Sequence, residues 1–350
     1  MCLEDRISSI RVGDEEAAGK ARRRWDALAK PLGSLGVLEE DIVRIAALTG
    51  DADVKLDHRV LVVVCADNGV VRQGISQTDE SATSAVAAAL GRGTSTINHM
   101  ARVVNCRVVP VDAGMAGETP EGVLPGKIRN GTCDISKGPA MTRSECEKTI
   151  LAGISFAEEQ KKKGADILLL GEMGIGNTTT TAAVTSVLLG KDAAETAGKG
   201  AGLSDEGLKR KIGVIRQAVR VNAPDPGDPL DVLLKVGGFD LAFLCGLCLG
   251  GAMYRIPVLL DGVITNAAAL LAVRLCPSAR DALIASHISR EPAADFLLNE
   301  LGLSPCIDAG VHLGEGAGAV LALGLLDQAL ALYTDGSTFQ KLGIEAYKPL

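Results

Sequence analysis

The chain has 350 residues, a formal net charge of −7, and an apolar share of 47%. This length accommodates one large domain with an appendage, or two domains, and the apolar share allows a sizeable buried core. The acidic balance argues against nucleic acid or an anionic membrane surface as the main partner.

The N-terminal segment is predicted to be helical. Its start, MCLEDRISSIRVGDEE, is too acidic and polar for a signal peptide. The stretch RRRWDALAKPLGSLGVLEEDIVRIAALTG predicts two helices broken at KPLG (30–33). The chain after Leu321 reads as helical again. We therefore expect residues 1–55 and 321–350 to pack together as a small helical domain beside a large domain spanning 56–320.

The large domain is predicted to have an α/β fold built on a parallel sheet. Short β-branched runs alternate with alanine-rich helical stretches along this part of the chain. Runs such as LVVV and ILLL are continuous rather than alternating, as expected for strands covered by helices on both faces. The predicted strands are 59–67, 106–114, 165–173, 256–262 and 281–289.

Each predicted strand ends in polar or glycine residues. Asp67 ends the first strand and Asn68 follows it, Glu172 lies near the end of the third, and Asp261 near the end of the fourth. Ligands of open parallel sheets bind beyond the carboxyl ends of the strands, so these ends predict a shared site. The alternative is that they are ordinary turns.

The stretch ILLLGEMGIGNTTTTAAVTSVLLG (167–190) predicts a strand, a glycine loop and a helix. Asn177 and Thr178 are expected to cap that helix, whose free amides would favour a phosphate. No Gly-Lys-Ser/Thr follows, so this is not a Walker loop. A well-capped helix without a ligand is the alternative. Glu172 would repel a phosphate unless it served the other end of the substrate.

Two later stretches could complete an anion site. GKGAGLSDEGLKRKIG (198–213) offers Lys211, although a lysine on a helix is usually solvated, and SHISREP (286–292) offers Ser289. The four histidines lack metal-ligand spacing. Neither a metal nor a cofactor is expected.

The longest apolar run, LAFLCGLCLGGAMY (241–254), is too short for a membrane helix and predicts a buried core helix. It contains Cys245 and Cys248, the one Cys-x-x-Cys pair, without nearby histidines. The nine cysteines show no disulfide framework, which favours reduced thiols in the cytoplasm.

HLGEGAGAVLALG (312–324) places Glu315 between Gly314 and Gly316, just before a predicted helix. Glycines let a ligand approach the backbone closely, so a carboxylate there is expected to meet one. GEGAGA also fits a loose dinucleotide pattern. Too little chain follows it for a second strand, and Glu315 would repel a pyrophosphate, so we reject that interpretation.

The segments KPLGSLG, CADNGV, GEMGIGNTTT, GLSDEGLKRK, SHISREP and HLGEGAGA occur in the order and spacing of one family. The chain resembles the nicotinate-nucleotide–dimethylbenzimidazole phosphoribosyltransferases, which activate the lower ligand of cobamides. The resemblance runs from about Lys30 to Leu330. It implies a Rossmann-like large domain, a small helical domain made from both chain ends, and a dimer. It also implies transfer of phosphoribose from nicotinate mononucleotide to an aromatic base.

The resemblance implies roles for particular residues. Glu315 would be the general base, Glu172 would lie beside the reacting groups, and Lys211, Ser289 and the amides of 174–176 would hold the phosphate. The full set of substrate-binding residues expected is Gly174, Gly176, Asn177, Thr178, Lys211, Ser289, Gly314, Gly316, Asp67, Asn68, Ser76 and Asp261.

The base pocket departs from the family pattern. Many members have a histidine where this chain has Asn68, and the stretch GISQTDESATSAVAAAL carries no aromatic residue. A benzimidazole, a purine or a phenol is therefore a possible base. The alternatives are a phenol-activating subunit of a heterodimer with a paralogous chain, a degenerate partner subunit, and an NAD-dependent oxidoreductase.

Overall fold

The computed structural model describes residues 3–347. Its centre is a parallel six-stranded sheet with the order β3-β2-β1-β4-β5-β6. The strands are β1 (Arg59–Ala66), β2 (Arg107–Gly114), β3 (Leu124–Pro125), β4 (Ile167–Met173), β5 (Val258–Leu260) and β6 (Leu283–Ala285). A strand forms within each of the five predicted ranges, but β5 and β6 are shorter than predicted, with three residues each. The short β3 was not predicted, because two residues carry no periodic pattern.

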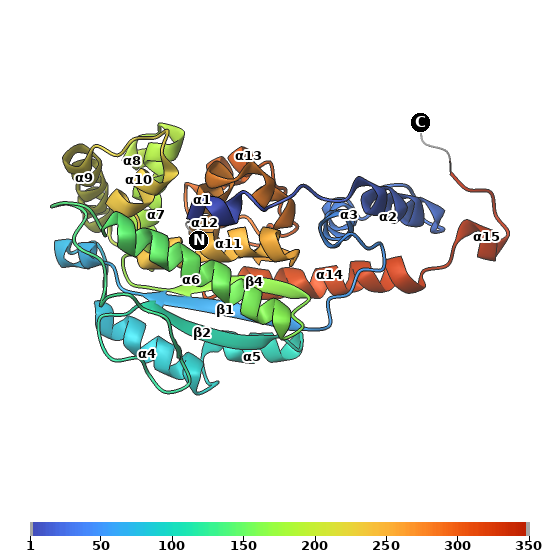
Figure 1. The fold of residues 1–350 in the computed structure, drawn as a ribbon, viewed down its shortest axis with the longest axis horizontal. Helices are drawn as coiled ribbons and strands as arrows, with labels where there is room; N and C mark the ends of the chain where they lie inside the picture. Colours follow the sequence, from blue (N-terminus) through green and yellow to red (C-terminus); the bar gives the residue numbers. More distant parts are fainter. Residues whose placement is uncertain (1–2, 348–350) are drawn as a thin grey trace.

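Helices cover both faces of this sheet (Figure 1). The helices that position the site are α4 (Glu80–Gly91), α7 (Asn177–Leu189), α9 (Asp205–Asn222), α12 (Val263–Leu275) and α14 (Ala317–Asp335). The others are α1 (Leu3–Ile7), α2 (Glu15–Ala27), α3 (Val37–Thr49), α5 (Thr96–Val103), α6 (Arg143–Lys162), α8 (Ala193–Thr196), α10 (Pro229–Val236), α11 (Phe239–Tyr254), α13 (Ala294–Leu301) and α15 (Phe339–Leu342).

Alternate residues of each central strand enter two different cores. Val60, Val62 and Val64 pack with α6, α7, α11 and α12 on one face. Leu61 and Val63 pack with α3, α4, α5 and α14 on the other. Burial on both faces explains the continuous apolar runs of the strands and confirms the predicted doubly covered sheet.

The predicted buried helix is α11, in which Cys245 and Cys248 are both fully buried. It lies directly against α6 (Figure 1). A Cβ atom at Gly153 of α6 would lie 2.9 Å from the Cα atom of Gly246, so the small residues in this apolar run let two helix backbones pack closely.

The two chain ends pack against each other at the side of the sheet. The Trp25 and Tyr333 rings lie 5.0 Å apart, and the Ala29 amide donates to the Ser337 carbonyl at 2.8 Å. Figure 1 shows α2 and α3 lying along the far end of α14. Within residues 3–347, α14 is the one helix long and apolar enough to cross a membrane, but half of that apolar stretch is buried.

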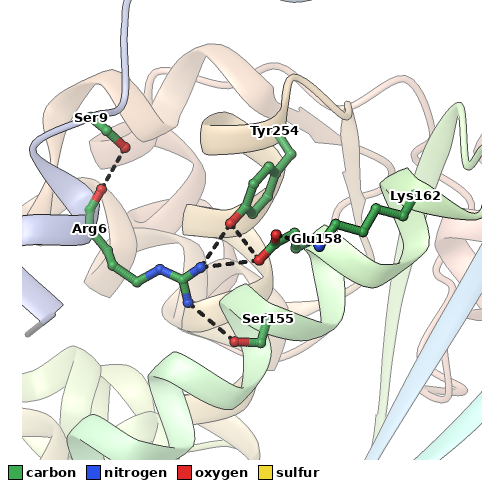
Figure 2. A network of polar contacts seen from close by, with 6 residues as sticks. All are labelled: Arg6, Ser9, Ser155, Glu158, Lys162 and Tyr254. Atoms are coloured by element: carbon green, nitrogen blue, oxygen red, sulfur yellow. Dashed lines mark hydrogen bonds and ion pairs between the residues drawn. The ribbon is translucent and has the colours of Figure 1, made fainter. Parts of the chain in front are cut away.

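α1 packs elsewhere, although it belongs to the same N-terminal segment. Figure 2 shows its Arg6 reaching α6 and α11. The guanidinium donates to Ser155 at 3.2 Å, to Glu158 at 3.2 Å and to the Tyr254 hydroxyl at 2.9 Å. Leu3 is buried in the core beside α6. The N-terminal segment is thus divided, with α1 on the sheet unit and α2 and α3 on α14.

Candidate active site

The candidate site lies where the strand order reverses, between β1 and β4. Val64 of β1 pairs with Glu172 of β4, so Asp67 and Glu172 leave the same edge of the sheet. Asp261 follows β5 on the other side of β4. Open α/β sheets bind their ligands in the crevice at such a reversal. The predicted convergence of strand ends is therefore present.

The GEG turn (314–316) rests on the end of β4. A side chain at Gly171 would collide with the Glu315 carbonyl, so only glycine permits this approach. The three φ angles of the turn are +81°, +57° and +93°. A left-handed glutamate is uncommon, and such strain persists only where the surroundings impose it.

The Glu315 carboxylate is half-buried, and its Oε2 atom is fully enclosed. That oxygen has no hydrogen-bond partner in the described chain. Burial raises the pKa of Glu315, and the nearby charge of Asp261 raises it further. A half-buried carboxylate with a free oxygen and a raised pKa is suited to accept a proton from a ligand.

Asp261 lies beneath this turn. Its Oδ2 atom accepts from the Gly316 amide at 3.1 Å, and its Oδ1 atom accepts from the amides of Gly318 at 2.7 Å and Ala319 at 3.3 Å. The predicted substrate-binding aspartate therefore has both oxygens engaged by the start of α14. The sequence did not show this contact, because the partners are more than 50 residues apart.

Glu172 is buried beside Gly314 of the GEG turn. The side-chain amide of Asn177 donates to it, and a Cβ atom at Gly314 would lie 3.1 Å from its Oε1 atom. Burial raises the pKa of Glu172 to about 8, with Asp261 adding to the effect and the Asn177 hydrogen bond opposing it. Glu172 is therefore mostly uncharged at neutral pH and does not repel an anion strongly.

The start of α7 differs from its prediction. Gly176 occupies the N-cap position with φ of +93°, and no side chain caps the helix there, so the predicted caps by Asn177 and Thr178 are wrong. The left-handed glycine shifts the helix start, and both residues fall inside the first turn. Their side chains bind Glu172 and Lys211 instead.

Lys211 reaches this helix start from α9. Its ammonium donates to the Thr178 hydroxyl at 2.8 Å and to the Gly198 carbonyl at 3.0 Å, and the residue is 1% exposed. Burial lowers the pKa of Lys211 to about 8. The lysine is thus buried beside a helix N-terminus, which is a combination that suits a phosphate.

The SHISREP segment borders this lysine. The Glu291 carboxylate accepts from the Gly200 amide at 2.9 Å, and the Glu291 amide donates to the Ser289 hydroxyl at 3.4 Å. Ser289 Oγ would lie 3.7 Å from a Cβ atom at Gly262. Ser289 thus lies beside the residue that follows Asp261, within the predicted group.

The end of β1 carries two buried side chains with a free oxygen each. Asp67 accepts from the Ala116 amide at 2.8 Å, and Asn68 donates to Asp240 at 3.4 Å. The Oδ1 atoms of Asp67 and Asn68 have no partner within residues 3–347. Asp67 and Asn68 line a hollow of about 50 Å³ beyond the strand.

Ser76 lies in the segment before α4, and its hydroxyl accepts from the Thr78 amide at 3.3 Å. The neighbouring Gln77 donates to the Gly202 carbonyl and joins this segment to the 198–202 loop. The structure thus brings the segment to the loop that precedes α9, the helix that carries Lys211.

Sequence reasoning missed three polar residues of this region, of which Thr83 and Asp240 are buried and Glu291 is partly buried. Thr83 accepts from the Ile175 amide at 3.1 Å, Glu291 holds the 198–202 loop, and Asp240 pairs with Asn68. Asp240 could have been noticed as a lone acid at the start of an apolar run, and Glu291 lies inside a quoted motif. No group of metal-binding geometry occurs among the described His, Cys, Asp and Glu side chains.

Known proteins share this sequence and fold over nearly their whole length. The phosphoribosyltransferase family model matches residues 10–344. A relative from Ruminiclostridium cellulolyticum named nicotinate-nucleotide–dimethylbenzimidazole phosphoribosyltransferase is 45% identical, with 100% of both chains covered. A relative of the same name from Acetivibrio thermocellus is 44% identical over 98% of each. A crystal structure of CobT from Thermus thermophilus is similar with a TM-score of 0.89 and 41% identity, covering 95% of this chain and 100% of that chain.

Proposed function

The chain belongs to the nicotinate-nucleotide–dimethylbenzimidazole phosphoribosyltransferase family, and from this membership we propose its reaction. It transfers the phosphoribosyl group of nicotinate mononucleotide to a ring nitrogen of a benzimidazole-type base. The products are an α-riboside phosphate and free nicotinate. The main observation in support is the Glu315 carboxylate, which is held in a left-handed turn with one enclosed, unpartnered oxygen.

One general base is sufficient for this reaction. Nicotinate leaves the ribosyl carbon with the electron pair of the breaking C–N bond, so its ring nitrogen departs neutral and needs no acid. The incoming azole attacks through one nitrogen and loses the proton on its other nitrogen. We assign that proton to Glu315. General-base help of this kind is typically worth about 10²–10⁴-fold.

The phosphate of the nucleotide is proposed to lie at the start of α7. Lys211 supplies the positive charge, and Thr178 and the amides around Gly174 and Gly176 supply further donors. To bind a phosphate, the Lys211 ammonium would exchange its contact with the Gly198 carbonyl for one with the phosphate oxygens. The raised pKa of Glu172 keeps the neighbouring carboxyl largely neutral.

The glycines of the GEG turn leave space for a flat aromatic ring next to Glu315. Gly314 directly precedes Glu315 and lies close to the Glu172 side chain. We propose that Asp67, Asn68 and Ser76 border the substrate cavity opposite the GEG turn. Correct placement of both reactants in line is expected to contribute at least as much to the rate as proton removal.

We propose that the protein acts as a dimer in the cytoplasm. Leu321 and Leu332 of α14 are 43% and 37% exposed, and Val103 at the end of the neighbouring α5 is 84% exposed. Exposed apolar side chains on adjacent helices support an assembly interface. The described cysteines are free thiols, as expected in a reducing compartment.

The test is to incubate the purified protein with nicotinate mononucleotide and a panel of benzimidazole, purine and phenol bases. Nicotinate release that depends on an added azole, together with the matching riboside phosphate, is the expected result. Absence of release with every base, even after addition of a paralogous chain, would contradict the proposal. Light scattering of the same sample should give a dimer mass for the chain alone; a monomer mass would contradict a homodimer.

A further inference from the structure

We propose that Asp261 is a positioning residue for Glu315, which holds the GEG turn in its left-handed conformation and sets the electrostatic environment of the Glu315 carboxylate. This inference rests on the proposed function, in which Glu315 accepts the proton of the base. It assigns Asp261 a role other than contact with the substrate.

The geometry makes Asp261 the link between the sheet and the turn. It follows β5 directly, is 3% exposed, and accepts from the amides of Gly316, Gly318 and Ala319. Its own amide donates to the Thr265 hydroxyl at 2.9 Å, which fixes it to the first turn of α12. Burial raises the pKa of Asp261, and the three amide contacts oppose this shift because they stabilise the ionised form, which accepts on both oxygens.

The turn needs such a restraint. Glu315 has φ of +57° between two glycines, and a glutamate in this conformation relaxes unless its surroundings hold it. Among the described residues, α14 has no N-terminal cap from its own N-cap residue, Gly316. Asp261 supplies that cap from a distance and fixes the residue that follows Glu315.

A second contact holds Asp261 from the β6 side. The Ser286 hydroxyl donates to the Asp261 carbonyl at 3.1 Å and lies 2.9 Å from the His287 Nδ1 atom. A side chain at Gly318 would collide with the His287 ring, so the ring packs on the first turn of α14. Burial lowers the pKa of His287. The negative charge of Asp261 opposes this shift by favouring the protonated imidazole.

Three of the acceptor positions of the Asp261 carboxylate are taken by amides of α14. The charged or titratable groups that face it are His287 from the end of β6, Glu172 from β4, and Glu315 itself. The Asp261 charge raises the pKa of Glu315, and a stronger base accepts a proton more readily.

The test uses Asp261→Asn, which removes the charge and one acceptor oxygen at nearly constant volume. We expect kcat to fall by about 10- to 100-fold because the base is displaced and weakened, with KM for nicotinate mononucleotide changed less than about threefold. Removing the negative charge lowers the pKa of Glu315. The acid limb of the kcat–pH profile should therefore move to lower pH.

The matched control is Asp228→Asn. Asp228 caps α10 through the amides of Leu230 at 2.9 Å and Asp231 at 3.2 Å, away from the GEG turn. This variant removes the charge of a different capping carboxylate, and its kcat and pH profile should stay near those of the wild type. If it reproduced the pH shift of Asp261→Asn, the effect would come from general destabilisation and the proposal would fail.

Hydrogen exchange separates this proposal from the proposed reaction. The amides of Gly316, Gly318 and Ala319 should exchange faster in Asp261→Asn than in the wild type, whether or not the chain transfers phosphoribose. A raised KM with unchanged kcat and unchanged exchange would show a substrate contact and overturn the proposal. If Asp261→Asn does not fold, Asp261→Glu keeps the charge but shifts the carboxylate. Its kcat should fall with the acid limb unmoved, and a wild-type kcat would overturn the proposal.

Discussion

The starts of α7 and α14 have the same backbone conformation but different side chains around them. Gly176 and Gly316 are the two N-cap residues, each with φ of +93°, and neither helix has a side-chain cap from that residue. Glu172 lies beside the start of α7, and Glu315 directly precedes the N-cap residue of α14. At α14 the buried Asp261 accepts hydrogen bonds from three amides at the helix start. At α7 the neighbouring residue is a buried lysine.

The difference teaches which end of the substrate each helix can receive. A helix N-terminus carries a partial positive charge that favours an anion. At α14 the Asp261 carboxylate offsets that partial charge, so this helix start does not favour binding of a phosphate. The start of α7 keeps its partial charge and gains Lys211. This difference supports the proposal that the phosphate binds at α7 and the aromatic base at the GEG turn.

The largest effect is expected at the GEG turn. Glu315→Gln removes the proton acceptor while keeping the shape of the side chain, so kcat with an azole base should fall by about 10²-fold or more. The dissociation constant for nicotinate mononucleotide, measured by calorimetry, should change little. A rate near that of the wild type would reassign the base to Glu172. With a phenol of low pKa as nucleophile, the loss should be smaller.

A smaller effect is expected at α7, and it should appear in binding. Lys211→Met removes a charged donor, which is worth about 1.5–3 kcal/mol, so KM for nicotinate mononucleotide should rise by about 10- to 100-fold. Nicotinate riboside, which lacks the phosphate, should bind both proteins alike. Lys209→Ala removes an exposed lysine of the same helix and serves as control. Equal losses with nucleotide and riboside would remove Lys211 from the phosphate site.

The second glutamate should be the less sensitive one. Because the pKa of Glu172 is raised to about 8, the side chain is already largely neutral at pH 7. Glu172→Gln should therefore lower kcat at pH 7 by less than about tenfold, while a carboxylate required as base would cost far more. Steady-state kinetics beside Glu315→Gln would measure the contrast. Equal losses in the two variants would erase the distinction drawn between the turns.

The pH profile of kcat/KM should report the titration of Glu315 on its acid limb and of Lys211 on its alkaline limb. The raised pKa of Glu315 means that activity is lost, as pH falls, at a higher pH than for an ordinary glutamate. The pKa of Lys211, lowered to about 8, means that phosphate binding weakens as pH rises through that value. In Lys211→Arg, where the cation stays protonated, the alkaline limb should move to higher pH. An unmoved limb would assign it to Glu172 or another group.

The catalytic candidates could be found from local sequence, and their supports could not. Glu172 and Glu315 each lie in a glycine-rich turn between two regular elements, which is a pattern visible in a few residues. Asp261 was also selected, but its contacts with the amides of 316–319 were not foreseen, because those partners are distant in the chain. The capping prediction at Asn177 was wrong because a backbone angle, not residue preference, determined the helix start.

By itself the sequence determined the strands, the doubly covered sheet and the edge at which the polar residues gather. These follow from periodicity and from short motifs, whose causes are local. Only the tertiary structure decided that α1 packs against α6 and not against α2 and α3, that Asp261 caps α14, and that burial makes Glu172 nearly neutral. Such features depend on which distant groups share a desolvated volume, and that is determined only when the chain is packed.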